Sequence, residues 1–212
     1  MCISAIVSLA TFAISIISSF VLIYYGQYRF ARENLVIGTF FIYVAIMQLL
    51  EWVMWTDIDG KKGWNQIATM ITPIYVYIQP FVLYYIEVAV YGWKRGSESN
   101  LVLVAAALYL VVSVLQYREF VKGGVLVTDK CGGETLHWKW IPYFNILLYF
   151  FVFIYAIFSF MPLPFSLLVF VIGCICLAIS ILKYWGSSSS FFCFISALAP
   201  IAFILIEPLL PL

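Results

Sequence analysis

The stretch that decides the fold lies at residues 48–91. It reads QLLEWVMW at 48–55, then the short charged segment TDIDGKK at 56–62, and then WNQIATMITPIYVYIQPFVLYYIEVAVY at 64–91. A helix crosses the hydrocarbon core of a bilayer with about 20 apolar residues. Two apolar segments joined by so short a charged loop therefore predict two antiparallel membrane-spanning helices.

Polar side chains recur along one face of each of these two helices. In the first, Gln48, Glu51 and Trp55 follow the spacing i, i+3, i+7 that places side chains on one helix face. In the second, five polar residues fall within about an 80° arc at 100° per residue. This polar stripe, the candidate ligand or ion pathway, consists of Gln48, Glu51, Trp55, Asn65, Thr69, Thr72, Gln79 and Glu87, with Glu207 as a secondary candidate.

The composition of the chain is that of a membrane protein. Of its 212 residues, 65% are hydrophobic and only 10% are charged, whereas a soluble globular domain carries about 25% charged residues. The polar residues are too few to cover a water-soluble body, so we expect an integral, multi-pass membrane protein. A net charge of +1 without a basic patch argues against nucleic acid as a partner.

The whole chain divides into seven apolar segments. They lie at about 4–25, 34–55, 64–91, 100–116, 140–160, 165–185 and 191–210. We therefore predict an all-α fold, an integral membrane bundle of seven transmembrane helices that forms one domain over residues 1–212. An odd number of spans places the two termini on opposite sides of the membrane. The excess of lysine and arginine in the loops on one side favours an N-terminus inside the compartment.

Shorter signals predict how parts of this bundle are built. Serines on one face of the first segment, among them Ser8, Ser15 and Ser19, form a small-residue seam at which another helix packs closely. The turn-rich DKCGGE predicts a short β-hairpin in the loop at 117–139. The run GSSSS at 186–190 predicts a polar turn before the seventh segment.

Depth in the membrane predicts which polar residues meet. Glu51 lies one turn before the second segment ends, and Thr69 lies about one turn after the third begins. In an antiparallel pair these two levels coincide, so Glu51 is expected to contact Asn65 or Thr69, with Gln48 one turn deeper near Thr72. Two interpretations stay open: a polar pocket that acts on a ligand, or a structural clasp that fixes the helix pair.

The other two carboxylates within apolar segments leave a similar choice. Glu87 lies at the far end of the stripe, and Glu207 lies near the end of the seventh segment. Each is either part of a site or an interfacial residue that reaches the lipid headgroups. Carboxylates at membrane depth are costly, which is why such residues are typical of proton relays and cation sites.

Motifs of enzymes and cofactor sites are absent. The chain has no GxSxG, HExxH or P-loop and no readable nucleophile–base pair, so we expect neither enzymatic activity nor a cofactor. Cys131, Glu134 and His137 have a spacing of three residues, which is not a recognised metal-ligand set, so no metal site is expected. The seventh segment has no lysine at mid-depth, which argues against a retinal protein.

One part of the chain carries a family resemblance. The segment FIYVAIMQLLEWVMW at 41–55, followed by Asn65, Thr69 and YIQPF at 77–81, resembles an uncharacterised group of seven-span membrane proteins from large DNA viruses, protists and marine microbes. Members of this group show a Glu and a Gln near an aromatic residue in one span and Gln-Pro-aromatic in the next. The resemblance implies seven helices and a shared polar site, and it implies nothing about substrate.

Three functions remain open from the sequence. The first is a channel or transporter for protons, a small cation or a small solute through the polar stripe. The second is a receptor-like or lipid-binding seven-helix module that holds an apolar ligand among its aromatic side chains. The third is a structural membrane protein without a pore. The partners expected are the lipid bilayer, one of these small ligands and further copies of the chain in a homo-oligomer.

Overall fold

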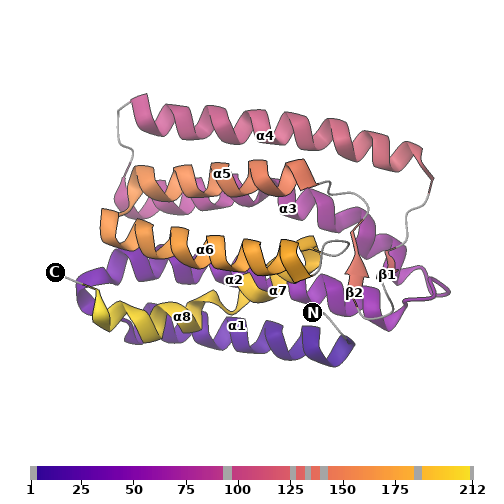
Figure 1. The fold of residues 1–212 in the computed structure, drawn as a ribbon, viewed down its shortest axis with the longest axis horizontal. Coiled ribbons are helices and arrows are strands. Elements are labelled where there is room, and N and C mark those ends of the chain that lie inside the picture. Colours follow the sequence, from indigo (N-terminus) through magenta and orange to yellow (C-terminus); the bar gives the residue numbers. More distant parts are fainter. Residues whose placement is uncertain are drawn as a thin grey trace.

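A computed structural model describes residues 4–92, 97–124, 128–131, 135–138, 143–183 and 188–210. The helices are α1 (Ala5–Tyr25), α2 (Ala31–Thr56), α3 (Trp64–Tyr91), α4 (Ser97–Lys122), α5 (Tyr143–Phe160), α6 (Leu163–Lys183), α7 (Ser188–Ala197) and α8 (Ala199–Ile206). Two 3-10 turns, η1 (Tyr28–Phe30) and η3 (Glu207–Leu209), and two strands, β1 (Asp129–Cys131) and β2 (Thr135–His137), complete it. The long helices lie side by side. Helix α1 begins at one end of the bundle, and α8 leads the chain to the opposite end (Figure 1).

The length and composition of the helices make the chain a multi-pass membrane protein. Within the described ranges, six helical segments are long and apolar enough to cross a membrane, and the sixth, Ser190–Leu209, comprises most of α7 together with α8 and η3. Large apolar side chains on their outer surface, such as Leu108 at 63% and Leu182 at 87%, are exposed where lipid can surround them. The 18-residue helix α5 is apolar but shorter, so the predicted seventh crossing stays a prediction.

The serine face of α1 packs against α2. Ser8, Ser15 and Ser19 are completely buried. A Cβ added to Gly38 of α2 would lie 2.5 Å from Ile23 Cγ1 and 3.0 Å from the backbone oxygen of Ser19. The small-residue seam therefore brings the two helix backbones close together, as the sequence predicted.

Helices α2 and α3 are joined at mid-length by a pair of tyrosines. The rings of Tyr43 and Tyr75 stack with centroids 4.1 Å apart, and each hydroxyl donates to the other residue's backbone oxygen, at 3.1 and 2.7 Å. Helix α3 runs unbroken through both of its prolines. A second tyrosine, Tyr117 of α4, donates to the Met70 oxygen of α3 at 3.2 Å, so tyrosine hydroxyls join α3 to both neighbouring helices.

Helix α4 continues well past its predicted end at residue 116. Lys122 Nζ lies 2.7 Å from Glu119 Oε1, one turn away, so the last turn has its own ion pair. The helix stops at two glycines, where Gly124 adopts a left-handed conformation with φ of 71°. The connection to α5 is therefore shorter than the sequence predicted. The predicted start of the fifth segment, at residues 140–142, lies outside the described residues.

Two short strands follow α4, in the loop where the sequence predicted a β-hairpin, and the hairpin itself stays a prediction. Strands β1 and β2 pair antiparallel, with Asp129 opposite His137 and Cys131 opposite Thr135. The predicted turn, at residues 132–134, lies outside the described residues. This two-stranded element sits at the same end of the bundle as the loop between α2 and α3 (Figure 1).

The seventh apolar segment is broken into two helices. The predicted polar turn at 186–190 is wrong for its last three residues, since helix α7 already begins at Ser188; serine is favoured at helix starts. The break between α7 and α8 lies at Leu198, whose backbone oxygen accepts from Ile201 N at 3.1 Å. Pro200, in the first turn of α8, has no N–H to continue the helical bonds of α7 across this point.

Single cysteines introduced at Tyr28 and Asp59 will be labelled from opposite sides of the membrane, because α2 lies between them. Tyr28 is 95% exposed, and the side chain of Asp59 is 72% exposed. The measurement is labelling by an impermeant maleimide in vesicles that hold the protein in one orientation, with Cys2→Ser and Cys131→Ser to reduce background. Labelling of both positions from the same side would show that α2 does not cross.

Candidate functional site

The predicted polar stripe faces the inside of the bundle. Seven of its eight residues are at most 2% exposed, and the eighth, Trp55, is half-buried. The helical period thus identified the inner face of α2 and α3 correctly. The structure divides the stripe into separate environments: a network at the loop end, a carboxylate bound by α7, and an amide beside a cavity.

Asn65 and Thr69 form a network with Thr128, the residue before β1. Asn65 Nδ2 donates to the Thr128 oxygen at 2.9 Å, and Thr128 N donates to Asn65 Oδ1 at 2.9 Å. Thr69 Oγ1 donates to Asn65 Oδ1 at 3.0 Å and lies 2.8 Å from Thr128 Oγ1. Asn65 Nδ2 also donates to the Met54 oxygen at 3.3 Å. These bonds hold the segment after α4 against the α2–α3 pair, which is the arrangement of a structural clasp.

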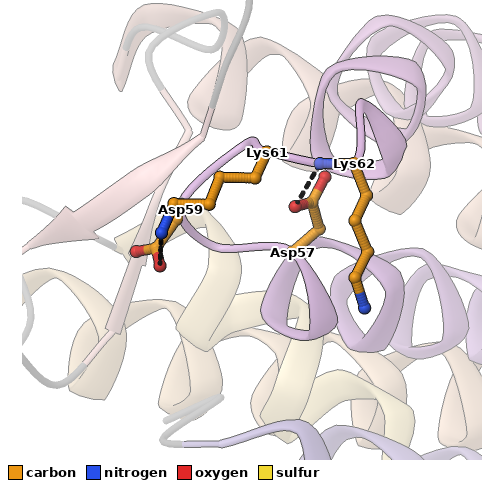
Figure 2. Close-up of polar contacts among 4 residues, drawn as sticks. All are labelled: Asp57, Asp59, Lys61 and Lys62. Carbon is orange, nitrogen blue, oxygen red and sulfur yellow. Dashed lines mark hydrogen bonds and ion pairs between the residues drawn. The ribbon is translucent and has the colours of Figure 1, made fainter.

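Asp57 fixes the loop that leads into α3. Its carboxylate accepts from the backbone N–H of Lys62 at 2.9 Å and from that of Asn65 at 3.3 Å. Figure 2 shows the hydrogen bond between Lys62 N–H and Asp57. Beside it lies the exposed ion pair of Lys61 with Asp59, whose charged atoms are 3.9 Å apart. The hydrogen bond from Lys62 N–H is the largest cause that holds the pKa of Asp57 below its usual range.

Glu51 is fully buried and is bound by α7. Ser190 Oγ donates to Glu51 Oε1 at 2.6 Å. The sequence predicted contacts of Glu51 with Asn65 or Thr69, and it did not predict this hydrogen bond from the seventh apolar segment. Farther along the stripe, Thr72 Oγ1 donates to the Ala68 oxygen of its own helix at 2.7 Å.

The other two carboxylates also lie inside the protein. Glu87 is 0% exposed and Glu207 is 1% exposed, so of the two alternatives left open by the sequence, burial within the bundle favours a place in a polar site over a side chain that reaches the lipid headgroups. Glu207 Oε1 accepts from Asn34 Nδ2 at 2.8 Å. Arg29 donates to the backbone oxygens of Glu207 and Leu210, at 3.2 and 2.9 Å. The end of the seventh segment is thus fastened to the turn between α1 and α2.

A cavity of about 70 Å³ lies between α2, α3, α5, α6, α7 and α8. Aromatic side chains form much of its wall: Phe40, Phe41, Trp138, Tyr149, Phe150, Phe153, Phe192 and Phe203. Gln79, at mid-length in α3, brings an amide group to this wall, and its Oε1 accepts from the Tyr149 hydroxyl at 2.8 Å. The cavity is therefore a mainly apolar space with one amide–hydroxyl pair at its edge.

Three partners of the polar stripe were not predicted. Thr128 lies in a loop whose position the sequence does not determine, and Tyr149 is one of many aromatic residues in α5. Ser190 was assigned to a turn. One signal was available for Ser190: it stands at the start of the seventh segment, and an antiparallel placement beside the second segment would bring it level with Glu51.

No protein-family model, curated protein or solved structure matches the chain. The resemblance to the uncharacterised seven-span group therefore stays a prediction, and no residue takes its role from a relative. The identity of the chain as a multi-pass membrane protein follows from its helices, and the roles of its polar residues must be argued from their contacts.

Asn65→Ala will destabilise the protein, because it leaves the buried backbone oxygen of Thr128 without the donor that Asn65 provides, whereas the Thr128 N–H keeps Thr69 Oγ1 as an acceptor. One stranded buried group costs about 1–3 kcal/mol. The control is Thr72→Val, which removes only a hydrogen bond within α3 and should change stability little. The measurement is the melting temperature in detergent, and equal values for the two variants would contradict the clasp.

Asp57→Asn will remove a pH-dependent part of the stability. Because the folded pKa of Asp57 is lowered, its contribution is complete above the ordinary value of 3.8 and is lost as the pH falls through the folded value. The variant should melt below the wild type at neutral pH, and the two should converge in acid. Asp59→Asn, in the exposed ion pair, is the matched control. Curves for Asp57→Asn that stay parallel to the wild type throughout would refute the coupling.

Proposed function

We propose that this multi-pass membrane protein binds a small apolar molecule in the cavity between α2, α3, α5, α6, α7 and α8, as a receptor-like or lipid-binding module. The observation that carries the proposal is the wall of the cavity, on which eight aromatic side chains converge. Sites for small molecules are typically concave and apolar, with a few placed polar groups that orient the ligand. Here Gln79 and Tyr149 are such groups.

The aromatic wall supports binding of an apolar molecule even inside a membrane. A ligand that moves from lipid into the cavity gains little from the hydrophobic effect, because lipid tails are themselves apolar. Binding must come from close contact with the wall. Phe153 lies 5.4 Å from Phe40 and 6.2 Å from Tyr149 between ring centroids, so the rings form a continuous surface from α2 to α5.

A photoreactive probe tests this proposal. A small alkyl diazirine, activated in nanodiscs, should label cavity residues such as Phe150, and Val169→Phe should abolish that labelling by filling the space. Val169 is 4% exposed and lines the cavity, whereas Val171, 50% exposed, lies on the outer face of the same helix. Val171→Phe is therefore the matched control. Labelling confined to outer residues, and unchanged by Val169→Phe, would contradict the proposal.

A second function, transfer of protons, a small cation or a small solute, is supported by the burial of Glu51 and Glu87. Both carboxylates are 0% exposed within α2 and α3. Ionisable residues at membrane depth are costly and are typical of ion and proton pathways. Glu51 of α2, bound by Ser190 of α7, lies where these two helices meet.

Glu51→Gln will abolish any proton flux through the protein, because it keeps the size of the side chain and removes its titration. The measurement is the decay of a pH gradient across proteoliposomes. Glu119→Gln, at the exposed end of α4, is the control and should leave the flux unchanged. A wild-type flux no greater than that of empty liposomes, or one that Glu51→Gln leaves intact, would eliminate this second function.

A further inference from the structure

Gln79, which lines the cavity, has a side-chain amide with an unpaired hydrogen-bond donor. The side chain is 2% exposed, and its oxygen is engaged by the Tyr149 hydroxyl at 2.8 Å. Its Nε2 is buried and has no hydrogen-bond partner among the described residues. Buried polar groups are normally paired, so the unpaired Nε2 of a residue that lines the cavity marks a place for a hydrogen-bond acceptor.

We propose that the cavity ligand is a small apolar molecule with a carbonyl-type acceptor, bound by the Gln79 Nε2. This inference rests on the proposed ligand-binding function. Tyr149 sets the direction of the amide: since its hydroxyl donates to Oε1, the end that remains for a ligand is the NH2 group. A ligand with an acceptor satisfies this donor, and a pure hydrocarbon or a ligand with only a donor does not.

The size of the cavity limits the ligand. One water-sized group takes roughly 10–15 Å³ of such space, so the cavity of about 70 Å³ holds about five to seven of them. A cyclic ketone of about seven heavy atoms suits this volume, with its ring among the phenylalanines and its oxygen at Gln79. Aldehydes and esters of similar size belong to the same chemical class.

Three probes of similar size separate the hydrogen bond from the apolar contact. Cyclohexanone offers an acceptor, cyclohexane offers neither group, and pyrrole offers a donor; each is supplied to the detergent-solubilised protein at equal activity through the vapour. Affinities are obtained from the rise in melting temperature. Val169→Phe, whose cavity is filled, shows how much of that rise comes from the effect of the probe on the detergent micelle. The wild type should bind cyclohexanone about five to ten times more tightly than cyclohexane, and pyrrole should show no such advantage.

Two variants test the role of Gln79. Gln79→Leu should bind cyclohexanone and cyclohexane equally. Tyr149→Phe keeps the amide but lets it present either end, so pyrrole should gain affinity and the preference for cyclohexanone over pyrrole should shrink. Equal binding of both six-membered rings by the wild type, or a preference that Gln79→Leu retains, would overturn this inference and leave the ligand site standing. Stabilisation no greater than in Val169→Phe, for every probe, would refute the proposed function itself.

Discussion

The fold depends on the need of buried polar groups to find partners within the chain. Inside a membrane no bulk water is available, so an amide, hydroxyl or carboxyl group needs its hydrogen-bond partner from within the protein. Asn65 with Thr128 and Glu51 with Ser190 meet this need across large distances in the sequence. Apolar contacts alone would choose poorly between alternative helix arrangements, because lipid solvates the same side chains equally well. The polar pairs therefore specify which helices are neighbours.

Much of the helical framework could be predicted because its signals are local. Hydropathy and length identified α2 and α3, and the period of the polar residues identified their inner faces. The end of α4 was missed, since it is set by the glycine pair that follows Lys122 rather than by hydropathy, on which the predicted end was based. The break at Leu198 was also missed: Pro200 indicates a bend, but whether the helix bends or separates depends on what packs around it.

The candidate site was predicted in its residues and not in its partners. Burial of Glu51 and Gln79 follows from their helix faces, whereas their hydrogen bonds come from α7 and α5, whose placement the sequence leaves undetermined. The polar stripe acts as a structural clasp at one position and borders a pocket at another. Asn65 is hydrogen-bonded to Thr128 and forms the clasp. Gln79, farther along α3, lines the cavity. One periodic pattern therefore encodes two tasks.

The seventh segment is fastened to α2 near both of its ends and interrupted between them. Ser190 binds Glu51 at one end, and Glu207 binds Asn34 at the other. Asn34 and Glu51 are 17 positions apart in α2, and Ser190 and Glu207 are 17 positions apart in the seventh segment, so the two segments stay level over this length. A segment that is hydrogen-bonded to α2 at two positions resists sliding along it. Ser196 and Ala199, on either side of Leu198, line the cavity, so the same two hydrogen bonds fix where this part of the cavity wall lies against α2.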